Sequence, residues 1–219
     1  FAAAIAARTT KIKIGFAVAQ MALHHPIRFA EQIALVDNIS KGRMIVGVGR
    51  GTAYNFYEFR GFGINPDEAH EMLLEVEDIL VKSWTTENYK HDGKFWQLEL
   101  PVLRPQVYQK PHPPIWVPGT GTLETMEFVA EHGYTYAAIT YSNVDSFRQN
   151  AATFRETWEK TGKSWDPSKL GWLVPIYVAE TDGKARKEAE PHLWYFAKTL
   201  LKGLGYSGTG ITWMPPGYT

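Results

Sequence analysis

The sequence contains no cysteine among its 219 residues. A chain without thiols forms no disulfide, no thiolate metal site and no cysteine nucleophile. Its 23 basic and 23 acidic residues cancel to a formal net charge of zero. Bulk charge therefore favours neither a nucleic acid nor an anionic membrane as a partner. The apolar runs are far shorter than the roughly 20 residues that a membrane-spanning helix needs.

Both ends of the chain indicate a larger protein. The opening "FAAAIAARTT" is typical of the tail of a helix, and the closing "ITWMPPGYT" is turn-like. We therefore expect a fragment that is incomplete at both ends and that aggregates in isolation, because it would expose sheet edges. The first residues have no basic segment followed by a long apolar core, so we expect a cytoplasmic protein without a signal peptide.

Apolar spacing alternates between the periods of strands and helices along the chain. Alternating strands and helices, with strands that are largely apolar, predict an α/β fold with a parallel sheet. The expected strands cover 11–19, 44–48, 114–119, 134–141 and 170–180. The expected helices cover 26–40, 66–80, 122–132, 144–160 and 182–204, with Asn65 as the cap of the second and Lys41-Gly42 as the stop of the first.

Residues 85–114 interrupt this alternation. The segment "YKHDGKFW" favours a hairpin around Asp92-Gly93, and five prolines then predict a stiff, extended path. Because strands and helices resume directly afterwards, we interpret 85–114 as an excursion inside one domain that covers 1–219, not as a linker.

The stretch "GRMIVGVGRG", residues 42–51, ends an apolar strand in three alternating glycines. A dinucleotide-binding fingerprint would need a third glycine where Thr52 stands and a helix directly after it, so that interpretation fails. The glycines could serve only tight strand packing. Arg50 argues for more, because a charge set just after a buried run is costly unless it meets a partner. At the carboxyl end of a parallel strand we expect that partner to be a ligand anion.

A second candidate anion site is "PGTGTLET", residues 118–125. It follows an expected strand and opens an expected helix, whose N-terminus favours phosphate. Gly119 and Gly121 would let backbone N–H groups approach a ligand, while Thr122 and Thr125 offer hydroxyls. An ordinary threonine cap is the competing interpretation.

The histidines give weaker signals. His25 precedes the helix-starting Pro26 beyond a buried strand, so it is a pocket candidate, with a helix cap or a packing residue as the competing interpretation. His24 and His25 point apart on an extended chain and do not share a metal. Leu74 stands where the zinc-protease motif needs its second histidine, and we predict no metal site.

Two segments resemble the bacterial luciferase-like flavin-dependent monooxygenase family. They are "IGFAVAQMALHHPIRFAEQIALVDNISKGRMIVGVGRG" and "PQVYQKPHPPIWVPGTGTLETMEFVAEHG", and the likeness covers nearly the whole chain. The resemblance implies a (β/α)₈ TIM barrel, present here as about strands 3 to 7 with their helices, with 85–114 before the fifth strand. It also implies that FMN binds at the carboxyl face of the sheet.

The resemblance further implies roles for single residues. Arg50 corresponds to the arginine that grips the FMN phosphate, and Thr122 and Thr125 to hydroxyl residues at the phosphate-binding helix start. Ala17 and Val18 correspond to a pair behind the isoalloxazine ring, often joined by a cis peptide bond. The full set of expected cofactor-binding residues is Ala17, Val18, Gly49, Arg50, Gly51, Thr52, Gly121, Thr122 and Thr125.

The implied activity is oxygenation of an apolar organic substrate by O₂ and reduced FMN, which a separate flavin reductase supplies. His25 is the candidate catalytic residue, with the main catalytic segment expected before Phe1, and a homodimer is expected. Gly49 stands where luciferase carries a reactive cysteine, so light emission is not implied. Two alternatives stay open: a deazaflavin-dependent hydride-transfer oxidoreductase, and a non-catalytic flavin-binding subunit.

Overall fold

The computed structural model describes residues 1–51, 56–139, 144–174 and 176–195. The chain divides into two compact units, one made of residues 1–51 and 58–118 and the other of residues 52–57 and 119–219. Each unit has its own strands and its own covering helices. That the whole of 1–219 forms a single domain stays a prediction.

The first unit is built on parallel strands around β3 (Met44–Gly49). The short strands β1 (Ile14–Gly15) and β2 (Ala19–Gln20) pair with β3 on one side, and β6 (Ile115–Gly119) pairs with it on the other. All these pairs are parallel. The predicted α/β fold with a parallel sheet is therefore confirmed in this unit.

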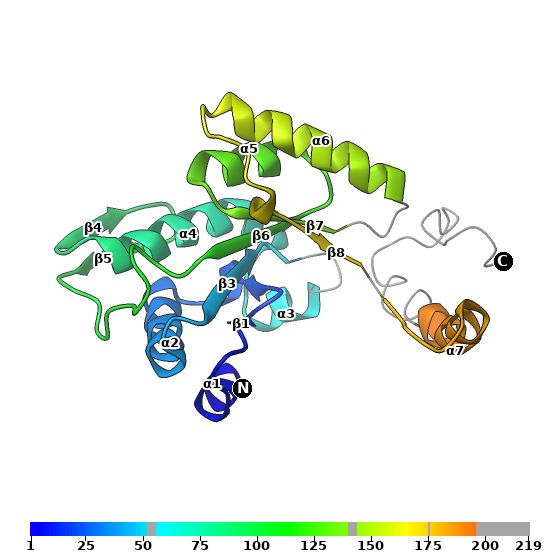
Figure 1. Cartoon of the computed structure of the whole chain (residues 1–219). Helices are drawn as coiled ribbons and strands as arrows, with labels where there is room; N and C mark the ends of the chain where they lie inside the picture. Colours follow the sequence, from blue (N-terminus) through cyan, green and yellow to red (C-terminus); the bar gives the residue numbers. More distant parts are fainter. Residues whose placement is uncertain (52–55, 140–143, 175, 196–219) are drawn as a thin grey trace. The chain divides into compact units, whose positions relative to one another are not determined.

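Two helices cover this sheet and lie side by side in Figure 1, α2 (Pro26–Ser40) and α4 (Ala69–Thr85). α2 begins at the predicted proline and ends where Lys41 and Gly42 adopt positive φ, as predicted. Asn65 accepts the N–H of Asp67 at 3.1 Å, which confirms the predicted cap before α4. The shorter helical segments are α1 (Ala2–Arg8), η1 (Met21–Leu23), α3 (Phe56–Gly61) and η3 (Pro66–Glu68).

The predicted hairpin inside 85–114 is confirmed. Strands β4 (Tyr89–Asp92) and β5 (Gln97–Leu100) pair in antiparallel fashion, beside α4 (Figure 1). After the hairpin, the segment around Gln109 is hydrogen-bonded to α2 through Asp37, which is fully buried. The Asp37 carboxylate accepts the backbone N–H of Gln109 at 2.9 Å and its side-chain amide at 2.8 Å. A buried carboxyl group is tolerated there because both of its oxygens accept hydrogen bonds.

Glu75 of α4 anchors the hairpin. Its carboxylate accepts the backbone N–H groups of Phe95 and Trp96 at 3.0 and 2.9 Å. It also pairs with the Nε2 atom of His91 at 3.0 Å. Burial raises the pKa of Glu75, but the hydrogen bonds from His91, Trp96 and Phe95 outweigh burial and leave the pKa below its ordinary value of 4.5. The charged carboxylate therefore stabilises the packing of the hairpin on the helix.

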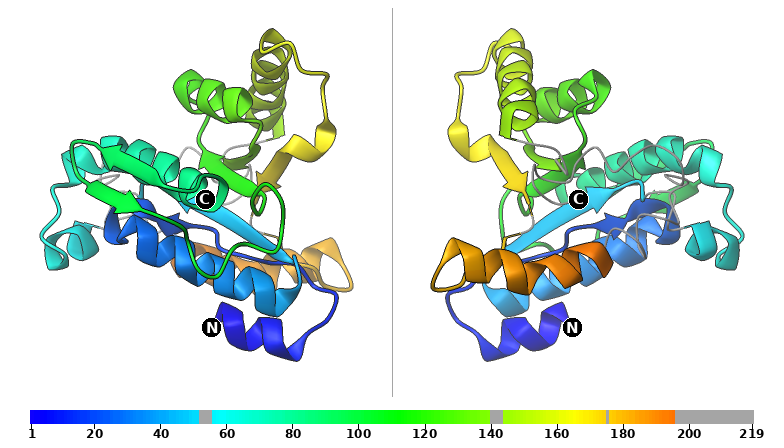
Figure 2. Two further views of the ribbon diagram at one scale, coloured as in Figure 1. Left: turned by 90° about the vertical axis from the view of Figure 1, so that its left-hand side faces the viewer. Right: turned by 90° about the vertical axis from the view of Figure 1, so that its right-hand side faces the viewer.

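The second unit contains the parallel pair β7 (Thr135–Ile139) and β8 (Leu170–Leu173). Helices α5 (Leu123–His132) and α6 (Val144–Lys160) lie side by side in both views of Figure 2. Tyr136 and Phe154 stack at 5.0 Å between ring centroids and are both fully buried. The turn η4 (Pro167–Lys169) leads into β8, and α7 (Asp182–Tyr195) follows it.

Two predicted strands differ from the structure, α4 ends at Thr85 and not at residue 80, and one predicted helix is described only in part. The continuous strand over 11–19 is wrong, because residues 16–18 leave the ladder and separate β1 from β2. The strand over 170–180 ends at Leu173, and 174 and 176–180 form no strand. The helix over 182–204 is described as far as Tyr195, and the rest of it lies outside the described residues.

The segment 16–18 lies directly over two glycines of β3. A Cβ atom on Gly47 would overlap the backbone carbonyl oxygen of Phe16, and one on Gly49 would lie 2.5 Å from a methyl carbon of Val18. Real Cβ atoms do not approach other atoms so closely. Both glycines are therefore required by the packing of residues 16–18 on β3, which was the simpler of the two interpretations of the glycine pattern.

Replacing Glu75 by glutamine is expected to lower the free energy of unfolding by about 1–3 kcal/mol at neutral pH, because charged acceptors make the stronger hydrogen bonds. Since the folded-state pKa of Glu75 is lowered, its stabilisation is present above pH 4.5 and is lost as the pH falls through the folded-state value. The difference from wild type in urea unfolding should therefore shrink at about pH 4 and below. Glu99→Gln, at an exposed pair with Lys90, is the control and should change stability by less than about 0.5 kcal/mol. Equal effects of the two variants would contradict the anchoring role.

Replacing Gly47 by alanine is expected to destabilise the protein by about 3 kcal/mol or more, because a backbone carbonyl cannot move aside as a side chain can. Gly61→Ala is the matched control: a Cβ atom there meets nothing within 4 Å. Urea unfolding of the two variants measures the difference. If Gly47→Ala unfolds at the same urea concentration as Gly61→Ala, the close approach of Phe16 to β3 is wrong.

Candidate functional site

The carboxyl edge of the first unit brings together several of the predicted site residues. β2 ends at Gln20 and β3 at Gly49, and these two residues are in register. Arg50 and Gly51 follow β3 directly. His25 lies at the same edge because the helix of a βα unit runs back along its strand, which places the start of α2 at the strand's carboxyl end.

Two arginines flank β3 and have opposite surroundings. Arg43, just before the strand, donates to the carbonyls of Ala6, Thr9, Ile12 and Ser40 at 2.6–2.8 Å and to the Thr9 hydroxyl at 2.9 Å. Arg50, just after the strand, is exposed and makes no hydrogen bond or ion pair within the part of the chain that the structure describes. The sequence suggested that burial would force a partner on Arg50. The Arg50 side chain is instead exposed, so solvent can satisfy its guanidinium. Its charge is open to an anion.

The residues next to Arg50 define the backbone around it. Gly51 has φ of 89°, a conformation that favours glycine. The Ala17–Val18 peptide bond is cis, as the resemblance implied. Ala17 is exposed and Val18 is half-buried against Gly49. The space beside Gly49 is thus filled by Val18, and Thr52 lies outside the described residues.

The two adjacent histidines have different surroundings. His24 is half-buried and stacks on Phe29 with 4.9 Å between ring centroids. Burial lowers the pKa of His24, which favours its neutral form. His25 occupies the cap position of α2, but its exposed side chain makes no capping hydrogen bond. His25 is thus the cap residue by position but makes no side-chain cap, and its role as a pocket residue stays a prediction.

In the second unit, the glycines of residues 118–125 serve packing as well as backbone shape. Gly121 has φ of 111°, and its N–H donates to the hydroxyl of Tyr136 at 3.0 Å. A Cβ atom on Gly119 would lie 2.5 Å from the Tyr136 ring, and one on Gly121 2.7 Å from the side-chain oxygen of Asn150. The pKa of Tyr136 is raised, because the effect of burial outweighs the lowering effect of the hydrogen bond from Gly121. The Gly121 N–H that we expected to face a ligand thus already has a partner.

The start of α5 presents two hydroxyls. Thr122 is at the cap position, yet its side chain caps no helix N–H. Its Oγ1 atom instead lies 2.8 Å from Oγ1 of Thr125. The first N–H groups of any α-helix have no partner within the helix. The interpretation of Thr122 as an ordinary side-chain cap is therefore wrong, and the hydroxyl pair remains beside the positive end of the helix.

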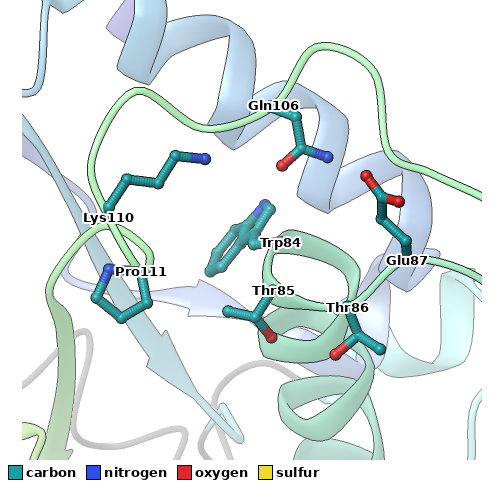
Figure 3. Close-up of a pocket in the computed structure, with 7 residues that line it drawn as sticks. All are labelled: Trp84, Thr85, Thr86, Glu87, Gln106, Lys110 and Pro111. Carbon is teal, nitrogen blue, oxygen red and sulfur yellow. The ribbon is translucent and has the colours of Figure 1, made fainter.

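A pocket of about 270 Å³ lies elsewhere in the first unit (Figure 3). In the close-up, the Trp84 ring lies between the side chains of Lys110 and Glu87. Trp84 belongs to the last turn of α4. Because α4 runs back along β3, this pocket is at the amino edge of the sheet and is separate from the predicted cofactor residues. Its lining residues are Trp84, Thr85, Thr86, Glu87, Gln106, Lys110 and Pro111.

One residue at the carboxyl edge was missed from sequence. Gln20 ends β2, and its side-chain amide donates to the carboxylate of Glu58 at 2.9 Å. The available signal was a polar residue at the end of the apolar stretch 14–19.

Two searches of the described residues found nothing. Those residues hold no group of three or more His, Asp or Glu side chains arranged for a metal ion. Every helix within the same ranges is too short or too polar to cross a lipid bilayer.

A family model described as luciferase-like monooxygenase matches residues 1–212. Among curated proteins, y4vJ of Sinorhizobium fredii is 30% identical over 78% of this chain and 48% of its own. The oxygenase component of the flavin-dependent trigonelline monooxygenase of Acinetobacter baylyi is 34% identical over 59% of this chain and 35% of its own.

Solved structures share the fold of this chain. Monooxygenase RslO1 from Streptomyces bottropensis has a TM-score of 0.84 and 25% identity, over 94% of this chain and 62% of its own. The oxygenating constituent of 3,6-diketocamphane monooxygenase from Pseudomonas putida, solved with FMN, has a TM-score of 0.81 and 22% identity, over 96% and 61%. The F420-dependent tetrahydromethanopterin reductase of Methanopyrus kandleri has a TM-score of 0.72 and 18% identity, over 93% and 62%.

The match extends over nearly all of this chain, which spans about half the length of the first curated relatives. The family resemblance noted in the sequence is thereby confirmed, along with the parallel α/β architecture that the family's structures share. The chain belongs to the luciferase-like monooxygenase family.

Proposed function

We propose that the chain is the FMN-binding part of a flavin-dependent monooxygenase that oxygenates an apolar organic substrate with O₂. One observation carries this proposal. Arg50 places an exposed positive charge, without a partner among the described residues, at the carboxyl end of β3. In parallel α/β folds this edge of the sheet is where ligands bind.

The residues present fit the phosphate of FMN. A guanidinium forms strong, often bidentate hydrogen bonds with phosphate, and Arg50 is the candidate for this contact. Within the second unit, the hydroxyls of Thr122 and Thr125 and the N-terminus of α5 offer donors of the kind that phosphate oxygens accept. The N–H of Gly121 serves Tyr136, so Gly121 contributes shape and not a donor.

The ring of the cofactor needs an apolar surface. Ala17 is exposed and Val18 half-buried over β3, and we assign them to the back of the isoalloxazine ring. Gly49 lets the Val18 side chain pack directly on β3, and Gly51 has the positive φ that favours glycine. Bound reduced FMN would supply the reaction with O₂, while these residues hold the ring and exclude water from it. His25 is the candidate for a polar contact with substrate at the same edge.

The rest of the proposal concerns the larger assembly. The two units would belong to a (β/α)₈ barrel, as about its strands 3 to 7. A separate reductase would supply reduced FMN, which the name "oxygenase component" of the Acinetobacter relative supports. A homodimer is part of the same proposal.

FMN is favoured over a deazaflavin by the family match and by the flavin-dependent Acinetobacter relative. The likeness to the F420-dependent reductase, at 18% identity, concerns the fold alone. The absorption spectrum of the cofactor that copurifies with the whole protein separates the two. Rapid reaction of the reduced holoprotein with O₂ separates an oxygenase from a non-catalytic flavin-binding subunit.

Replacing Arg50 by alanine is expected to raise the dissociation constant of FMN about 10- to 100-fold, because a charge-assisted contact with phosphate is lost. Riboflavin, which has no phosphate, should bind wild type and variant equally. Fluorescence titration of the whole protein with both ligands measures this. Arg155→Ala, at an exposed pair with Glu159, is the matched control and should leave both constants unchanged. An unchanged FMN constant, or equal losses for FMN and riboflavin, would contradict the assignment of Arg50 to the phosphate.

A further inference from the structure

The side-chain amide of Gln20 has two ends in different surroundings. Its Nε2 atom donates to Oε2 of Glu58 at 2.9 Å. Its Oε1 atom is buried, and none of the described residues donates a hydrogen bond to it. Buried polar oxygens in folded proteins nearly always have a donor, so this one requires an explanation.

Glu58 fixes which end of the amide is the oxygen. An ionised carboxylate only accepts hydrogen bonds, so it must face the NH₂ group of Gln20. Rotating the amide by half a turn would bring two oxygens together and leave the NH₂ group at the buried position. The unpartnered atom at the buried position is therefore an acceptor, and it is suited to an N–H or O–H donor.

The strand register places this acceptor at the predicted cofactor site. Gln20 is paired in register with Gly49, and Ala19 with Val48. Side chains in register on parallel strands point to the same face of the sheet. Gln20 therefore lies on the face of Gly49, the face over which Val18 packs, and one residue away from Arg50.

We propose that Oε1 of Gln20 accepts a hydrogen bond from the bound flavin and positions it on the surface of Ala17 and Val18. This inference rests on the proposed function, since it requires that FMN binds at this edge. The flavin offers donors of two kinds. The ring N3–H and the ribityl hydroxyls are present in both redox states, whereas N5–H is present only after reduction.

The test compares Gln20→Met with wild type in the whole protein. Methionine has a similar volume but no amide, so it removes the acceptor and leaves the packing nearly intact. The variant is expected to bind FMN about tenfold more weakly, the loss for about one hydrogen bond. Titration with oxidised FMN and, without oxygen, with FMN reduced by dithionite shows which donor is used. Equal losses indicate N3–H or a ribityl hydroxyl, and a loss confined to reduced FMN indicates N5–H.

A control and two further measurements separate positioning from a structural role. Gln32→Met, on the exposed side of α2, is the matched control and should bind FMN as wild type does. Without ligand, Gln20→Met should have the same melting temperature as the control Gln32→Met. The visible spectrum of FMN bound to Gln20→Met should differ from that of FMN bound to wild type. Gln20→Asn is the second variant, to be used if Gln20→Met fails to fold. It keeps an amide but withdraws it by one carbon–carbon bond, about 1.5 Å, and should show the same loss of FMN affinity.

Two results would overturn the inference. One is that a folded Gln20 variant binds both forms of FMN with the affinity and spectrum of wild type. The other is that its loss of affinity is matched by the control. If wild-type protein binds no FMN at all, the proposed function fails and the inference fails with it, so the two failures are distinguishable.

Discussion

The contact between residues 16–18 and the bare backbone of β3 is the constraint on which the first unit depends. The Phe16 carbonyl and the Val18 side chain occupy the positions that side chains on Gly47 and Gly49 would fill. This contact takes residues 16–18 out of the ladder and splits one strand into β1 and β2. It thereby sets Ala17, Val18 and Gln20 at the carboxyl edge, beside Arg50. A packing requirement of one strand thus determines where the candidate cofactor residues lie.

The two candidate phosphate contacts are built by different physical means. Arg50 offers a full charge in solvent, whereas the start of α5 offers helix N–H groups and a pair of threonine hydroxyls. Behind the second contact, the buried Tyr136 accepts the N–H of Gly121. That bond holds the glycine turn in place while its donor is withdrawn from ligand binding. A rigid turn that positions donors next to it serves an anion better than a loop that must be ordered on binding.

Much of the fold could be predicted because its signals are local. Pro26 and Lys41-Gly42 bound α2, and Asn65 caps the turn before α4, since each effect involves neighbouring residues. The break at 16–18 could not be predicted, because the apolar pattern of 11–19 is that of a continuous strand and the cause lies in β3. For Thr122, a side-chain cap and a hydroxyl pair require the same residue types, so only the structure distinguishes the two. Gln20 belongs to no sequence motif. Its amide is oriented by a hydrogen bond to Glu58, which is 38 residues away in the sequence.

The two ends of β3 show why the carboxyl edge is assigned to function. At the amino end, Arg43 satisfies its donors with backbone carbonyls and one hydroxyl, and nearby the buried Asp37 has both oxygens paired. These polar groups stabilise the fold and leave little for a ligand. At the carboxyl end, Arg50 and the Gln20 oxygen have no partner among the described residues. Arg50 is exposed, so its charge is available to an anion, whereas the buried Gln20 oxygen lowers stability unless a ligand supplies a donor. Their position at one edge supports the proposal that a cofactor binds there.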